Sequence, residues 1–287
     1  MIVKTLSGIP ILDDDFGGVF GNRSFLVSGA SGTGKTVCGL QFIRQGLEQE
    51  ERCLYLSTMA ANDLEICASA LGFSLTPHVD AENLTLLEYE SFIPGNGIPG
   101  QDMLPPGGFD QLGQIIHAGS IERVVLDTVL PWVSVKRPDR MPEQIFSFIR
   151  SFDRLGVTTL MTLPKPVSSM AFKLKKCLED VVPVSLLLQR GAEEETDAIH
   201  RMQVVKYLGE KKLGGKRSYV IEPGIGIRPA SEQDISTPPN NGTVHPGEET
   251  SHFRKPRFSD VRSDSTSKIP PLQNDRDDSF VLSLIHI

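Results

Sequence analysis

Gly29-Ala30-Ser31-Gly32-Thr33-Gly34-Lys35-Thr36 matches the pattern G-x-x-x-x-G-K-[ST]. The stretch follows an apolar, strand-like run at 25–27 and precedes apolar residues at helical spacing: Val37, Leu40, Ile43 and Leu47. In that context glycines let backbone N–H groups converge on one anion, and the helix N-terminus adds its positive dipole end. The sequence therefore predicts a phosphate-binding loop in which Lys35 reaches the β- and γ-phosphates and the Thr36 hydroxyl ligates Mg²⁺.

A second metal ligand is expected at the end of a buried strand. The run Arg123-Val124-Val125-Leu126-Asp127 is apolar and ends in an acid. Because the carboxyl ends of parallel strands share one edge of a sheet, Asp127 is predicted to lie beneath the phosphates and to complete the Mg²⁺ shell with Thr36.

Short apolar runs alternate with stretches of helical period up to residue 228, which is typical of a mostly parallel α/β sheet flanked by helices. We expect eight strands, at 24–28, 53–57, 84–88, 123–127, 157–163, 184–188, 202–207 and 218–222. One helix is predicted to begin at Pro142 and to end at Gly156. Its expected apolar face comprises Ile145, Phe146, Ile149 and Phe152.

Two segments depart from this alternation. Residues 91–110 hold five glycines and four prolines, which predicts a long surface loop. Residues 229–287 hold seven prolines and few aromatic residues, too few for a packed core, so we expect a disordered tail after a single domain at 1–228. We assign no function to the apolar residues 280–287.

Composition excludes several classes of function. The chain has 39% hydrophobic and 23% charged residues and a net charge of -7, which gives it no overall attraction to nucleic acid or to an anionic membrane. Its four cysteines stand singly, as in a reducing compartment, and no stretch has the length and character of a signal or spanning segment. We expect a cytoplasmic protein without a membrane partner.

A family resemblance rests on further motifs. Ser7-Gly8-Ile9-Pro10, then Leu12-Asp13 and residues 17–21, are similar to the "TGIPxLDxxxGGxxxG" segment of the KaiC-like branch of the RecA/RadA ATPases. Leu71-Gly72-Phe73 is similar to its "LGW" step, and the resemblance covers about residues 5–228. It implies a RecA-like P-loop NTPase fold, with ATP and Mg²⁺ at the subunit interfaces of a hexameric or filamentous homo-oligomer.

The first departure from this family concerns the general base. The family places a Phe-Glu-Glu type sequence after the strand that follows the P-loop helix, and its glutamate polarises the attacking water. Here the equivalent stretch, 56–61, contains no acid. Thr58 has a hydroxyl that can orient a water, but it cannot take a proton at neutral pH, and Met59 can do neither.

The second departure concerns the Lys-x-Arg finger that a neighbouring subunit places on the phosphates. The sequence keeps Lys206, which the resemblance assigns to catalysis in trans, but has Leu208 in place of the arginine. Arginine fingers contribute about 10³ to 10⁵ in turnover where they occur, so this loss also predicts slow chemistry.

We therefore favour a regulatory Mg-ATP-binding protein, weak or inactive in hydrolysis, whose nucleotide state sets its assembly or its contact with a protein partner. One alternative is an active ATPase whose base is Glu88 or Glu90. Another is an accessory ATPase of DNA recombination, which would use the cluster Lys165, Lys173, Lys175 and Lys176; we favour a solvated helix face for these lysines. A small-molecule kinase fits less well, because no arginine-rich lid is evident.

Overall fold

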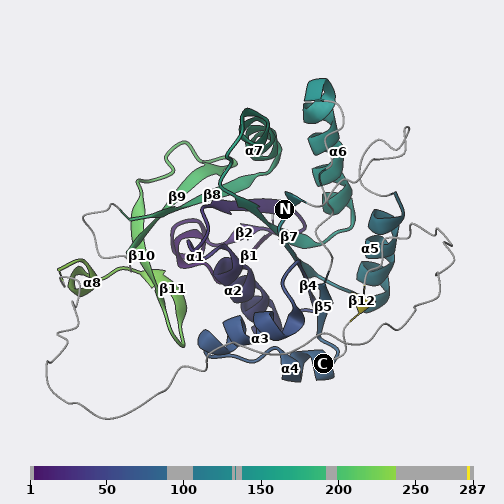
Figure 1. The fold of residues 1–287 in the computed structure, drawn as a ribbon, viewed down its shortest axis with the longest axis horizontal. Coiled ribbons are helices and arrows are strands. Elements are labelled where there is room, and N and C mark those ends of the chain that lie inside the picture. The colour runs from purple at the N-terminus through teal and green to yellow at the C-terminus, as the bar shows by residue number, and fades with distance from the viewer. Residues whose placement is uncertain are drawn as a thin grey trace, which may run out of the picture.

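The computed structural model describes residues 3–88, 106–130, 133, 138–191, 199–236 and 283–284. In these residues one sheet has the strand order β11-β10-β9-β8-β3-β7-β6-β4-β5-β12 (Figure 1). The central strands are buried on both faces, as expected for apolar runs that lie between two layers of helices.

Six neighbouring strands of the sheet are parallel. In spatial order they are β8 (Val184–Arg190), β3 (Ser24–Gly29), β7 (Thr158–Pro164), β6 (Arg123–Asp127), β4 (Cys53–Ser57) and β5 (Leu84–Glu88). This arrangement confirms the predicted fold class, a mostly parallel sheet flanked by helices. It also brings the carboxyl ends of β3, β6 and β4 to one edge.

Three antiparallel strands extend the sheet beyond β8: β9 (His200–Tyr207), β10 (Arg217–Glu222) and β11 (Gly226–Pro229). The sequence predicted the first two but not β11. A separate two-stranded sheet pairs β1 (Lys4–Thr5) with β2 (Val19–Phe20). The antiparallel strands lie beside the P-loop, so they add side chains to that region which the parallel strands alone would not.

Helices cover both faces of the sheet (Figure 1). On one side α2 (Lys35–Glu48) and α3 (Ala61–Ala70) pack into one buried apolar cluster, and on the other α5 (Pro106–Gly119), α6 (Met141–Arg154) and α7 (Ser169–Val181) pack into a second. The shorter helices are α1 (Pro10–Phe16), α4 (Thr76–Asp80), α8 (Glu232–Ser236) and the 3₁₀ turn Pro138–Arg140. None of the helices in the described part of the chain has the length and apolar character that a bilayer-spanning segment needs.

The predicted loop at 91–110 is wrong over its last five residues, because α5 begins at Pro106. A proline in the first turn leaves no hydrogen bond unmade, so the residue that suggested a loop instead starts a helix. Residues 91–105 lie outside the described residues. Regular structure continues past the expected boundary at 228, through β11 and α8, and β12 (Ser283–Leu284) pairs with β5. The rest of the predicted tail lies outside the described residues.

His200 gives the antiparallel strands a pH dependence. It is nearly buried, its ring is tilted at 55° against the Tyr219 ring, and burial together with the Arg190 charge lowers its pKa. The unfolded chain therefore binds more protons than the folded protein below about pH 6.5, so this contribution to stability is present above that pH and is lost as the pH falls.

We expect His200→Phe, which keeps an aromatic ring beside Tyr219, to lose less stability than the wild type between pH 7 and pH 5. Urea unfolding at several pH values measures this, with each protein referred to its own value at pH 8. Parallel losses in the two proteins would show that His200 does not carry the effect.

Candidate functional site

The P-loop joins the buried strand β3 to helix α2. Gly32 and Gly34 have φ angles of +76° and +84°, in the left-handed region that side chains other than glycine rarely adopt. Such alternation of backbone conformation turns successive N–H groups toward a common point and forms an anion-binding concavity. The predicted stretch from Gly29 to Thr36 thus has the backbone shape that a phosphate cradle requires.

Lys35 begins α2 and folds back over the loop. Its Nζ donates to the Ala30 carbonyl oxygen at 2.8 Å, and the Thr33 hydroxyl donates to the same oxygen at 2.8 Å. Burial lowers the pKa of the Lys35 ammonium, and the negative charge of Asp127 partly opposes that shift. A half-buried cation therefore lies at the mouth of the cradle, where a phosphate would offset its desolvation.

Thr36 and Asp127 meet as the sequence predicts. The Thr36 Oγ1 donates to Asp127 Oδ2 at 2.9 Å, although 91 residues separate them in the chain. A hydroxyl and a carboxylate are hard oxygen ligands, which suit Mg²⁺ when phosphate and water complete the shell. Among the described residues no group of three or more His, Cys, Asp or Glu side chains is placed to hold a metal ion.

Two further side chains hold Asp127 in place. Tyr55 OH donates to Asp127 Oδ2 at 3.1 Å, and Thr162 Oγ1 donates to Oδ1 at 2.6 Å. Sequence reasoning missed Tyr55, which looks like one more apolar residue of β4. The glycine at position 39, inside α2, could have indicated this role of Tyr55, because a Cβ at Gly39 would lie 2.8 Å from the Tyr55 hydroxyl oxygen. A glycine in a helix interior costs about 1 kcal/mol relative to alanine, so it often marks a close approach.

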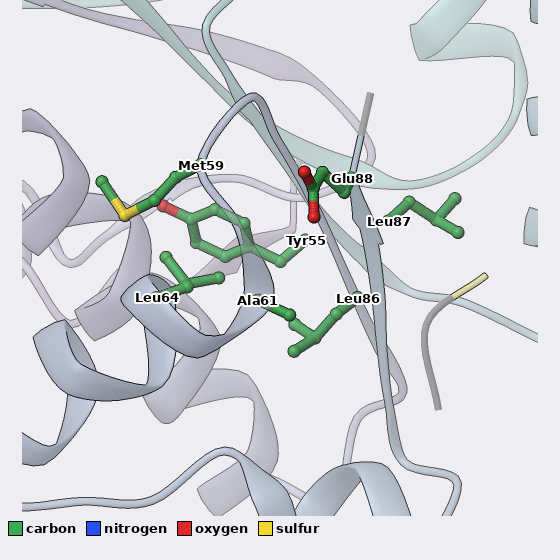
Figure 2. A pocket seen from close by; sticks show the side chains of 7 residues that line it. All are labelled: Tyr55, Met59, Ala61, Leu64, Leu86, Leu87 and Glu88. Atoms are coloured by element: carbon green, nitrogen blue, oxygen red, sulfur yellow. The ribbon is translucent and has the colours of Figure 1, made fainter. Parts of the chain in front are cut away.

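The stretch after β4 lies beside Asp127. The Thr58 N–H faces the Asp127 carbonyl oxygen at 3.4 Å, while the Thr58 residue itself is exposed. Met59 is partly buried and lines a small hollow with Tyr55 and Glu88. Figure 2 shows Met59 beside the phenol end of Tyr55, with Glu88 at the end of the neighbouring strand. Residues 58–61, which follow β4, therefore bring a thioether and no carboxylate to the hollow beside Tyr55, whose hydroxyl donates to Asp127.

Lys206 of β9 lies toward the opposite end of the strands from the P-loop. It pairs in register with Ser185 near the start of β8, whereas Gly29 of the P-loop pairs with Leu188 near the end of that strand. Its Nζ donates to the carbonyl oxygens of Glu179 and Asp180 at 2.9 and 2.7 Å. Lys206 is thus remote from the P-loop of its own chain.

Comparison with known proteins agrees with this geometry. The model of the KaiC family of ATPases matches residues 5–232. The chain belongs to the KaiC ATPase family. The match covers β3 to β11 of the main sheet and leaves out β12, so this is a RecA-fold ATPase domain of the ATP-binding KaiC type.

Individual relatives are distant members of the KaiC family. The chain is 25% identical over 251 residues to the circadian clock oscillator protein KaiC of Parasynechococcus marenigrum, a match that covers 86% of this chain and 49% of that protein. It is 27% identical over 226 residues to KaiC of Prochlorococcus marinus subsp. pastoris, covering 77% and 44%, and 25% identical over 257 residues to KaiC of Synechococcus elongatus, covering 86% and 48%. The chain spans about half the length of the curated relatives it matches.

Proposed function

We propose that this KaiC-family domain binds Mg-ATP at the P-loop, hydrolyses it slowly or not at all, and uses nucleotide state to set its assembly or its contact with a protein partner. One observation carries the proposal: the Thr36–Asp127 pair is complete, while residues 58–61 after β4 bring Met59, and no acid, to the hollow beside Tyr55, whose hydroxyl donates to Asp127. Nucleotide binding and base catalysis need different groups, so the first can persist without the second.

The residues present fit the nucleotide and its metal. The cradle of N–H groups suits phosphate oxygens, Lys35 suits the β- and γ-phosphates, and Thr36 with Asp127 suits Mg²⁺. When bound, Mg²⁺ neutralises charge on the phosphates. The chain's own contribution is to orient: Tyr55 and Thr162 hold the Asp127 carboxylate between them.

Assembly is part of the proposal. Because Lys206 lies toward the opposite end of the strands from the P-loop, we infer that it acts on a phosphate bound by a neighbouring copy and not on one bound by its own chain. This placement supports a hexameric or filamentous homo-oligomer with ATP between subunits. In a free subunit the Lys206 ammonium is held by the last carbonyls of α7, and burial lowers its pKa. Subunit contact must therefore compete with those two hydrogen bonds.

A cytoplasmic setting is also proposed. All four cysteines are free, and burial raises the pKa of both Cys38 and Cys53 to about 12. Such thiols stay protonated at neutral pH and behave as small apolar core residues, as expected of a chain that needs no disulfide.

Placing an acid at position 59 tests the weak-hydrolysis part. We expect wild-type turnover to be slow and Met59→Glu to raise it at least about tenfold, because a positioned general base contributes about 10² to 10⁴. Leu208, which replaces the finger arginine, limits the gain. Phosphate release from Mg-ATP by the full chain measures both.

Met59→Gln is the matched control, since it has the length of glutamate and cannot take a proton. Wild-type turnover as fast as that of active family members, or equal turnover in the two Met59 variants, would contradict slow hydrolysis for want of a base.

An active ATPase that uses Glu88 is a second candidate, which strand register favours. Ser57 of β4 pairs with Asp127 on one side and with Glu88 on the other, so the two acids occupy one row at the same sheet edge. Two strand spacings put their backbones about 10 Å apart, so Glu88 would act through water. A loss of turnover in Glu88→Gln, with Glu122→Gln at the other end of β6 unchanged, would favour this candidate. Glu90 lies outside the described residues.

A further inference from the structure

Side chains from β8 and from the antiparallel strand β10 contact the outside of the P-loop. Arg190, the last residue of β8, donates from a terminal guanidinium nitrogen to the Ser31 carbonyl oxygen at 3.0 Å. Tyr219 of β10 donates from its hydroxyl to the Thr33 carbonyl oxygen at 2.6 Å. Burial raises the pKa of Tyr219, so its phenol keeps the proton that it donates.

These contacts determine the direction of backbone N–H groups. In a trans peptide the carbonyl and the N–H of the following residue point in opposite directions. A Ser31 carbonyl held outward by Arg190 therefore turns the Gly32 N–H inward, and Tyr219 does the same for the Gly34 N–H. Free glycines would sample many orientations, so fixing these peptides before binding removes part of the ordering cost of binding.

The guanidinium lies close to the loop itself. A Cβ built on Gly32 would be 3.1 Å from the Arg190 nitrogen. Arg190 is an exposed residue, so solvent and salt screen its charge, and we assign its effect mainly to the directed hydrogen bond.

We propose that Arg190 is a positioning residue of the nucleotide site: acting within its own chain, it aims the Gly32 N–H at the phosphates. The proposal rests on nucleotide binding at the P-loop. It assigns to Arg190 a role that neither the P-loop pattern nor the finger motif contains. Tyr219 acts in the same way on the next glycine peptide.

Calorimetry of Mg-ATP binding to the full chain tests this assignment. It is done at low salt and at roughly 0.5 M salt, where a Debye length of a few Å screens exposed charges. Arg190→Met is expected to weaken binding about tenfold at both salt concentrations, because a charge-assisted hydrogen bond is lost. Arg190→Lys, which keeps a donor of similar reach, is expected to stay within about threefold of the wild type. Arg217→Met is the matched control, because Arg217 begins β10 and pairs with Asp15 of α1.

The outcomes separate the two proposals. No binding by the wild type would overturn the proposed function itself. Wild-type binding with an equally tight Arg190→Met variant would overturn the role of Arg190 alone. A difference in affinity between the Met and Lys variants that vanishes at high salt would show that Arg190 acts only as a screened charge, and would overturn the orienting role.

Tyr219→Phe keeps the ring beside His200 and is expected to weaken binding about fivefold, because one neutral hydrogen bond is lost.

Discussion

Arg123→Met is expected to lower the free energy of unfolding by about 3 to 5 kcal/mol, because it breaks a buried, fully paired charge. Arg123 is the largest wholly buried side chain among the described residues. Its Nε forms an ion pair with Glu51 at 2.5 Å, and its guanidinium lies over the Phe42 ring, 4.5 Å from the ring centroid. The remaining nitrogens donate to four oxygens, those of the Leu6 and Phe42 carbonyls, the Thr5 hydroxyl and the Gln49 amide.

These bonds tie two segments to the amino end of β6: the segment that carries β1, and α2 together with the turn that follows it. A methionine fills much of the volume but leaves the carbonyl of Leu6 without its donor, and an unmade buried hydrogen bond costs about 1 to 3 kcal/mol. Urea unfolding of the full chain measures the loss.

Arg44→Met is the matched control, because Arg44 of α2 is partly exposed and its pair with Glu48 is a surface pair worth less than about 1 kcal/mol. Glu51→Gln in the Arg123→Met background should then cost little, since its partner is already gone. If Arg123→Met lowered the free energy of unfolding by less than about 1 kcal/mol, the buried contacts of the guanidinium would not be important for stability.

The features that could be predicted from the sequence are those that depend on residues close together in the chain. The P-loop, Asp127 and the eight expected strands follow from local patterns, and each of those strands occurs within two residues of its expected ends. The helix from Pro142 is also found, and Ile145, Ile149 and Phe152 of its expected apolar face are buried, but Phe146 is not. Phe148 is buried, whereas Phe146 is 50% exposed. Phe146 and Phe148 lie on neighbouring sides of the helix, and the sequence pattern fits an apolar face that includes either of them. The packing of α6 against the sheet and α7 decides which one is buried, and the sequence pattern does not contain that packing.

Contacts between distant residues that no motif connects were beyond sequence reasoning, unlike the Thr36–Asp127 pair. Tyr55 and Asp127 are 72 residues apart, Arg190 and Ser31 are 159 apart, and Tyr219 and Thr33 are 186 apart. Each pairing depends on strand order, and the order β10-β9-β8-β3 is what brings the last two onto the P-loop. A lone tyrosine in an apolar run is compatible with any core position, so only the topology gives it a partner.

Lys35→Ala is expected to weaken Mg-ATP binding at least about a hundredfold without lowering the stability of the nucleotide-free protein. The first effect follows because truncating one partner of a close charge pair costs about 2 to 5 kcal/mol. The second follows from the pKa of Lys35, which burial lowers. A lysine whose pKa is lower in the folded protein stabilises it only at pH values above the unfolded pKa, so its ammonium gives no such benefit at pH 7.

The hydrogen-bond pattern points the same way. Removing Lys35 leaves the Ala30 carbonyl still paired with the Thr33 hydroxyl, so no loop acceptor is orphaned. Thermal melts should therefore show the variant at least as stable as the wild type without nucleotide, and only the wild type should gain stability when Mg-ATP is added. Lys176→Ala, exposed on α7, should behave as the wild type in both respects. If Lys35→Ala retained the nucleotide-dependent gain in stability, the Lys35 ammonium would not be a phosphate ligand. If the variant melted at a lower temperature than the wild type without nucleotide, Lys35 would be a residue that stabilises the loop itself.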